Sequence, residues 1–157
     1  MSNTLKLIIS IIIPLAIGFT SGFFTSTGAG SWYQTIQKPS WNPPDWIFGP
    51  VWTTLFILMG IALYFVWKSD AGVKIKNYAL FLFAVQLVLN FFWSFIFFRQ
   101  QEPGWAFLEI VILWLLILLT IFAFAKISNL SAWLLVPYIS WVSFASILNY
   151  TIWRMNS

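Results

Sequence analysis

The side chains of this sequence that could do chemistry are indole rings and amides rather than acids, bases or thiols. The 157-residue chain has 11 tryptophans but no histidine and no cysteine. It therefore lacks imidazole and thiolate ligands for a metal or haem, a Ser-His-Asp arrangement and disulfides. We find no phosphate-binding glycine loop and no dinucleotide fingerprint. An indole face, by contrast, stacks well on a flat aromatic molecule.

The composition indicates where such a molecule would bind. Hydrophobic residues make up 61% of the chain and charged residues only 8%, whereas soluble domains carry about 25% charged residues. Such a chain cannot cover a surface that faces water, so we predict an integral membrane protein in contact with the lipid bilayer. The net charge of +4 is spread over the connections, which argues against a nucleic-acid partner.

Five apolar runs are long enough to span a membrane, since about 20 helical residues cross a bilayer core. We predict an all-α, five-transmembrane-helix bundle that forms a single domain over residues 1–157. The first run has no small-residue cleavage site after it, so we interpret it as a retained span and not as a signal peptide. The predicted spans are approximately residues 5–26, 44–67, 77–98, 104–125 and 131–153.

Residues 27–43, between the first two spans, are rich in tryptophan and proline. The stretch from Trp32 to Trp52 contains four residues of each type. Because proline fixes φ and removes a donor, we predict a stiff, non-helical lid that leads into a helix capped by Asn42. An aromatic belt at the membrane interface is the alternative explanation for Trp41 and Trp46.

Three residues from three different spans lie at a similar depth beneath this lid. With a rise of 1.5 Å per residue, Trp52 lies about 12 Å and Asn90 about 10 Å below the lid side. Trp141 lies near the middle of the membrane by the same arithmetic. Two indoles and an amide at this depth predict one pocket under the lid, provided that their helix faces converge.

The polar and small residues of the spans have simpler explanations that remain open. The amides of Gln86 and Asn90 lie four residues apart, and they would equally well join helices at about 0.6 kcal/mol per hydrogen bond. The Gly18 and Gly22 pair is best explained by close helix packing, although it also leaves space for a ligand beside Gly22.

One carboxylate, Glu109, falls clearly inside a span. A buried ionisable residue in a membrane is a functional hypothesis by default. Glu109 could instead pair with Arg99 or Arg154, which belong to the same side of the membrane, or extend towards the lipid headgroups. We favour the structural ion pair.

The distribution of lysine and arginine predicts the orientation in the membrane. Positive residues accumulate on the cytoplasmic side. We therefore predict a multi-pass protein of the cell membrane with a cytoplasmic N-terminus and an external lid. One side carries Lys6, Lys68, Lys74, Lys76 and Lys126, and the other carries Lys38, Arg99 and Arg154.

Several motifs resemble one known family over nearly the whole chain. They are Trp32-Tyr33, Lys38-Pro39-Ser40-Trp41-Asn42-Pro43-Pro44, Phe48-Gly49-Pro50-Val51-Trp52, Gln86, Asn90, Trp93-Ser94, Pro137-Tyr138, Trp141, Ala145 and Leu148-Asn149. The chain resembles the tryptophan-rich sensory protein, the bacterial translocator-protein family once called the peripheral benzodiazepine receptor family. The resemblance implies a five-helix bundle, usually a homodimer, that binds porphyrins (tetrapyrroles) and synthetic benzodiazepine-site ligands.

The resemblance also implies a role for particular residues. Trp52 and Trp141 match tryptophans implicated in light-dependent breakdown of protoporphyrin, so they are the predicted catalytic residues. Lys38 or backbone donors would meet the propionates. No metal and no cofactor is expected, because the porphyrin is itself ligand or substrate. The predicted ligand-binding residues are Gly22, Tyr33, Pro43, Trp52, Phe56, Gln86, Asn90, Trp93, Trp141 and Ala145.

Two other functions are compatible with the same residues. One is transport or export of the same lipophilic ligands, and the other is a non-catalytic sensor whose ligand state alters a partner. Light-dependent loss of bound protoporphyrin would favour degradation, whereas movement of unchanged ligand across a bilayer would favour transport.

Overall fold

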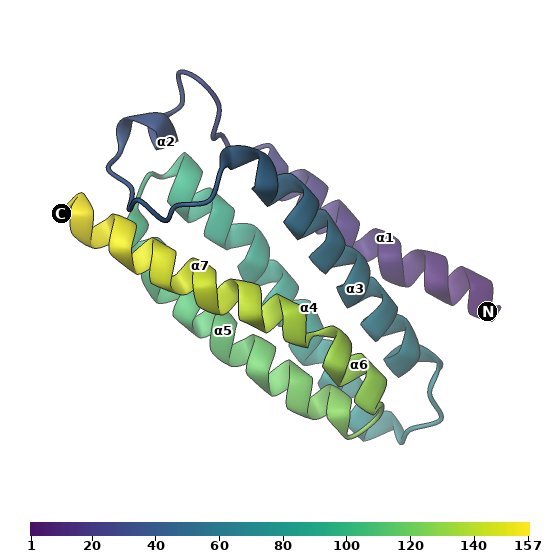
Figure 1. Cartoon of the computed structure of the whole chain (residues 1–157). Helices are drawn as coiled ribbons and strands as arrows, with labels where there is room; N and C mark the ends of the chain where they lie inside the picture. Colours follow the sequence, from purple (N-terminus) through teal and green to yellow (C-terminus); the bar gives the residue numbers. More distant parts are fainter.

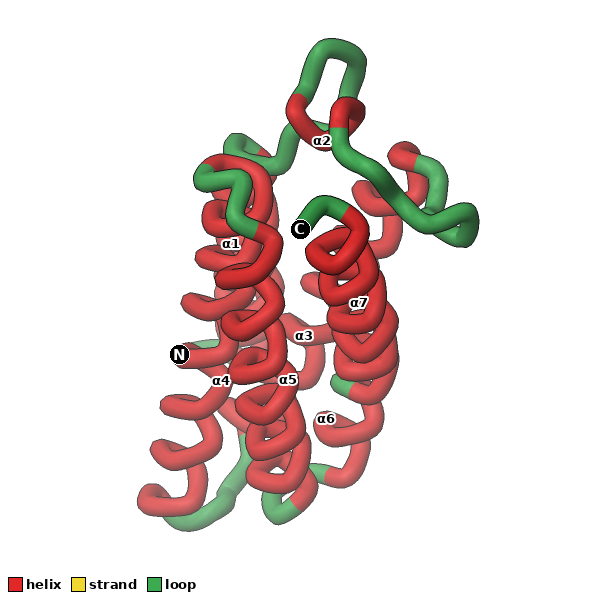
Figure 2. The backbone as a smooth tube through the Cα atoms, turned by 90° about the vertical axis from the view of Figure 1, so that its left-hand side faces the viewer, coloured by secondary structure: helices red, strands yellow, loops and turns green.

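The computed structural model describes all 157 residues. Its only regular structure is helical, and loops join the helices (Figure 2). Five helices are long and apolar enough to cross a membrane, which confirms the predicted all-α fold of five spans. They lie side by side, with the lid at one end of the bundle (Figure 1). In chain order the elements are α1 (Asn3–Gly22), α2 (Trp32–Thr35), the 3₁₀ turn η1 (Asp45–Ile47), α3 (Phe48–Lys68), α4 (Val73–Ser94), the π-helical turn η2 (Phe95–Arg99), α5 (Pro103–Ala125), α6 (Asn129–Leu134) and α7 (Val136–Met155).

Local sequence explains where several of these helices begin. The hydroxyl of Ser2 accepts a hydrogen bond from the amide of Leu5 at the start of α1, and Ser128 caps α6 in the same way. Pro103 opens α5, where its missing N–H costs nothing because the first amides of a helix have no partner.

The lid differs from the sequence prediction in three respects. Helix α1 ends at Gly22, four residues earlier than expected. The lid is not wholly non-helical, because α2 forms one helical turn within it. Asn42 does not cap a helix. The two prolines that follow Asn42 hold the chain extended, with ψ of 144° at Pro44, so regular structure begins only at Asp45.

The last span is two helices rather than the single predicted one. Helix α6 ends at Leu134 and α7 begins at Val136, with Leu135 between them. Pro137 explains the break, because it has no N–H to donate to the carbonyl four residues earlier.

The half of the bundle away from the lid is tightly packed. Met59, Ala62 and Val66 of α3 are completely buried there. At Gly60 the backbones of α1 and α3 approach so closely that a Cβ atom would lie 2.6 Å from the Cα of Ile11. The lid-side half is different, because it encloses a cavity.

Candidate ligand-binding cavity beneath the lid

A cavity of about 460 Å³ lies between α1, α3, α4 and α7 beneath the lid. This volume falls within the usual range of small-molecule sites, about 300–1,000 Å³. Trp52, Asn90 and Trp141 all line it, so the structure brings together the three residues that the depth argument singled out. None of the 24 lining residues is charged, so the cavity suits the apolar body of a ligand.

Most, but not all, of the predicted ligand-binding residues line the cavity. Pro43 and Gln86 do not line the cavity, and the role of all ten in binding stays a prediction. The predicted residues that do line it are Gly22, Tyr33, Trp52, Phe56, Asn90, Trp93, Trp141 and Ala145.

Trp52 is held in the α3 wall by two aromatic neighbours. Its ring stacks on Phe56 with centroids 5.6 Å apart, and it meets the ring of Tyr138 edge-on at 6.4 Å. The spacing of four residues places Trp52 and Phe56 on one helix face. These contacts fix the indole plane before any ligand binds.

Trp141 occupies the α7 wall. Its ring lies 5.4 Å from that of Phe144 and 6.2 Å from that of Phe48, which connects α7 to the start of α3. Its buried Nε1 has no hydrogen-bond partner. Ala145, one turn further along the same helix, also lines the cavity, and its small side chain keeps the space beside the indole open.

Trp93 and Asn149 tie three helices together on a third side of the cavity. The indole Nε1 of Trp93 donates to Asn149 Oδ1 at 2.9 Å, and Asn149 Nδ2 donates to the carbonyl of Pro103 at 2.8 Å. The Trp93 ring also stacks on Phe97 at 5.2 Å. This chain of contacts makes the wall rigid and leaves no free donor on Trp93.

The floor of the cavity is a buried hydrogen-bond network between α4 and α7. Asn90 Nδ2 donates to the Tyr138 hydroxyl at 2.9 Å, and that hydroxyl donates to Gln86 Oε1 at 2.6 Å. Gln86 therefore supports Asn90 from behind, whereas Asn90 itself faces the cavity. Both amides therefore join helices, and Asn90 also lines the cavity, while a role of either in ligand binding stays a prediction.

Glu109 is buried in α5, but the predicted ion pair is wrong. Neither carboxyl oxygen has a hydrogen-bond partner, so Glu109 contacts neither Arg99 nor Arg154. Both arginines lie at the ends of their elements and are exposed, so water and lipid headgroups can solvate them. Burying an arginine beside Glu109 would instead incur the desolvation cost of a buried ion pair.

The lid is fastened to the bundle at several points. The Tyr33 ring is 3% exposed, and its hydroxyl donates to Asn42 Oδ1 at 3.1 Å. Burial raises the pKa of this hydroxyl above its ordinary value of 10.0, so it stays a neutral donor. Gln37 and Asn156 exchange two hydrogen bonds of 2.9 Å, which join the lid to the end of α7.

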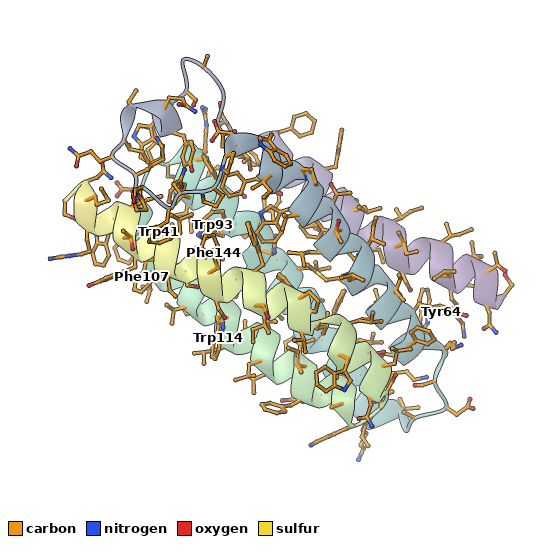
Figure 3. The ribbon with its side chains drawn as sticks, in the orientation of Figure 1. Trp41, Tyr64, Trp93, Phe107, Trp114 and Phe144 are labelled. Carbon is orange, nitrogen blue, oxygen red and sulfur yellow. The ribbon has the colours of Figure 1, made fainter.

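Aromatic contacts complete this closure. Trp41 meets the ring of Phe144 at 5.9 Å, and both gather with Trp93 at the lid end of the bundle, far from Tyr64 (Figure 3). Trp46 is 72% exposed, as expected of an interfacial tryptophan. The lid thus covers the cavity from the aqueous side.

Lys38 is occupied within the lid rather than directed into the cavity. Its ammonium group donates to the carbonyls of Tyr33 and Ile36 and lies 4.6 Å from the centre of the Tyr33 ring. It does not line the cavity. Carboxylates of a ligand would therefore have to remain near an opening.

The sequence reasoning missed several lining residues that helical periodicity would have found. On α1 the stripe that lines the cavity is Leu15, Gly18 and Gly22, and Thr25 follows just after the helix. On α7 it continues from Trp141 through Phe144, Ala145, Leu148 and Ile152. Once one residue of a helix lines a pocket, those three, four and seven positions away share its face.

Comparison with known proteins gives a consistent family assignment. The TspO/MBR family model matches residues 10–154. The tryptophan-rich protein TspO of Chlorobaculum tepidum is 49% identical over 97% of this chain and 96% of its own. The corresponding protein of Archaeoglobus fulgidus is 42% identical over 99% of both chains, and the translocator protein of Sus scrofa is 40% identical over 90% of this chain and 89% of its own. With its five membrane-spanning helices, the chain belongs to the TspO/MBR family of multi-pass membrane proteins.

Proposed function

We propose that the cavity binds a flat tetrapyrrole such as protoporphyrin and promotes its oxidative degradation in light. The observation that carries this proposal is that Trp52 and Trp141, from two different helices, line one uncharged cavity. Each stacked aromatic pair contributes about 0.5–1.5 kcal/mol beyond the burial of apolar area. Synthetic benzodiazepine-site ligands, which are also flat and aromatic, fit the same description.

The lining residues also limit the chemistry. Without histidine or cysteine the chain offers neither an imidazole nor a thiolate axial ligand for haem iron, so a metal-free porphyrin fits better. No carboxylate, lysine or arginine lines the cavity. The reaction therefore draws its energy from the excited macrocycle and its oxidant from dioxygen, which adds to the ring. An adjacent indole transfers an electron to the excited ring and is re-reduced when that electron returns.

The shape of the cavity favours binding over passage across the membrane. The Asn90–Tyr138–Gln86 network closes its floor, and the completely buried Met59 and Val66 lie on the α3 stretch beyond it. A fixed route to the opposite face would need polar or open space in this half of the bundle, where the structure has close packing instead.

Purified protein in lipid bilayers with protoporphyrin tests this proposal. We expect saturable binding in the dark, no loss of ligand in the dark, and loss with formation of an oxygenated product under illumination in air. Removing dioxygen should stop the loss. Unchanged ligand that accumulates on the far side of sealed vesicles would instead support transport.

A further inference from the structure

The cavity has an opening that faces the side of the bundle. Four of its lining residues are exposed, namely Phe19 and Gly22 of α1 and Gly49 and Thr53 of α3. All four lie within the stretches of α1, η1 and α3 that are long and apolar enough to cross a membrane. Phe19 and Thr53 lie inside these stretches rather than at their ends, where an exposed side chain faces lipid, so this mouth opens towards the bilayer.

The spacing between α1 and α3 explains the mouth. Away from the lid, a Cβ atom on Gly60 would lie 2.6 Å from the Cα of Ile11. Nearer the lid, a Cβ on Gly18 would lie 2.5 Å from the ring of Phe56. At Gly22 and Gly49 a Cβ would meet nothing within 4 Å. The two helices are therefore in close contact below the cavity, whereas at the lid end the Gly22 and Gly49 positions, which both line the cavity, meet no neighbouring atom.

The aqueous side, in contrast, is closed. The paired hydrogen bonds of Gln37 and Asn156 hold the lid against α7, and Trp41 packs on Phe144 beneath it. A ligand arriving from water would have to break these contacts. A ligand dissolved in the lid-side leaflet would meet an open mouth.

We propose that the ligand passes between the bilayer and the cavity through this lateral mouth, with Gly49 and Thr53 as its α3 edge. This inference rests on the proposed function and names the ligand class more closely. It is a membrane-dissolved amphiphile with a flat apolar body that enters the uncharged cavity. Its carboxylates stay at the mouth, near the headgroups, because no cationic side chain lines the interior.

Two neighbouring threonines provide a matched test. Thr53 and Thr54 are both exposed, and each hydroxyl donates to the carbonyl four residues earlier at 2.8 Å. Only Thr53 lines the cavity. In the full chain reconstituted in lipid bilayers, we expect Thr53→Trp to slow protoporphyrin association by about tenfold or more, within the range that interface variants span.

Dissociation should slow by a similar factor, because the ligand leaves by the same mouth, so the equilibrium affinity should change little. Thr54→Trp should match the parent in both rates. Asn156→Ala, which loosens the lid, should leave both rates nearly unchanged. Faster association in Asn156→Ala with parent rates in Thr53→Trp would overturn the lateral route in favour of entry through the lid.

A reversible version guards against misfolding of the tryptophan variant. The chain has no native cysteine, so Thr53→Cys is labelled with a bulky disulfide-forming reagent and the label is then removed by reduction. We expect slow exchange of ligand with the label and parent rates without it, and no effect of label on Thr54→Cys. If binding is saturable and both rates are unchanged by the label on Thr53→Cys, the lateral route is overturned but the proposed function is not. Absence of saturable binding in the parent chain would overturn the proposed function itself.

Discussion

Replacing Tyr138 with phenylalanine should destabilise the bundle by about 1–3 kcal/mol. The substitution removes one hydroxyl that accepts from Asn90 at 2.9 Å and donates to Gln86 at 2.6 Å. Side-chain hydrogen bonds in membrane bundles average about 0.6 kcal/mol and reach about 1.7, so two bonds give this range. Tyr138 and Gln86 are each 1% exposed, so the orphaned carbonyl oxygen of Gln86 cannot turn to water.

Reversible unfolding in mixed detergent micelles, followed by tryptophan fluorescence, measures this free energy. Tyr150→Phe is the control, because Tyr150 is 46% exposed on the outer face of α7. The double variant Tyr138→Phe with Gln86→Leu should be less destabilised than the sum of the single variants, because the two residues share one bond. If Tyr138→Phe were no less stable than Tyr150→Phe, the network would not hold the cavity floor.

Three further predictions concern the cavity, the helix contacts and the orientation. Ala145→Phe should fill the space beside Trp141 and weaken protoporphyrin binding in a titration, whereas Ala16→Phe, at an exposed site on α1, should not; equal affinity in both variants would place the pocket elsewhere. Gly60→Ala should lower the free energy of unfolding by about 1–3 kcal/mol because it pushes α1 from α3, whereas Gly49→Ala meets nothing within 4 Å and should not destabilise the fold; equal losses would contradict the described spacing. In intact cells an impermeant thiol reagent should label Ser40→Cys in preference to Ser69→Cys, as expected for an external lid, and the reverse preference would invert the topology.

The spanning helices and the depth of their residues follow from hydrophobicity and helical geometry, so they could be predicted from the sequence. An apolar run of about 20 residues must be a spanning helix in a chain with so few charges. Depth along a helix is simple arithmetic, so Trp52, Asn90 and Trp141 could be placed at one level before their convergence was known. Whether helix faces converge depends on how the helices rotate, which the spacing within one helix does not determine.

The lid and the mouth depend on contacts between distant segments, and for this reason they could not be predicted. Gln37 bonds to Asn156, 119 positions away, and Asn42 accepts from Tyr33 instead of capping a helix. The small-residue pattern of α1 favoured close packing at both glycines, with space for a ligand beside Gly22 as the alternative. Gly18 does pack closely, against the ring of Phe56, whereas a Cβ on Gly22 would meet nothing within 4 Å.

We propose that Trp52 and Trp141 carry the photochemistry and are more than walls of the cavity. Phenylalanine keeps an apolar aromatic face but is much harder to oxidise. Trp52→Phe and Trp141→Phe should therefore retain most of the affinity for protoporphyrin, since each loses only part of one stacking surface. Trp105→Phe is the control, because Trp105 is 64% exposed at the start of α5 and lies outside the cavity.

The most direct measurement is the rate of light-dependent ligand loss at saturating protoporphyrin, where occupancy is equal in every variant. We predict that Trp52→Phe and Trp141→Phe each slow this loss far more than they weaken binding, while Trp105→Phe degrades the ligand at the parent rate. Degradation at the parent rate in both cavity variants, with occupancy matched, would contradict the claim and leave the protein as a binding protein.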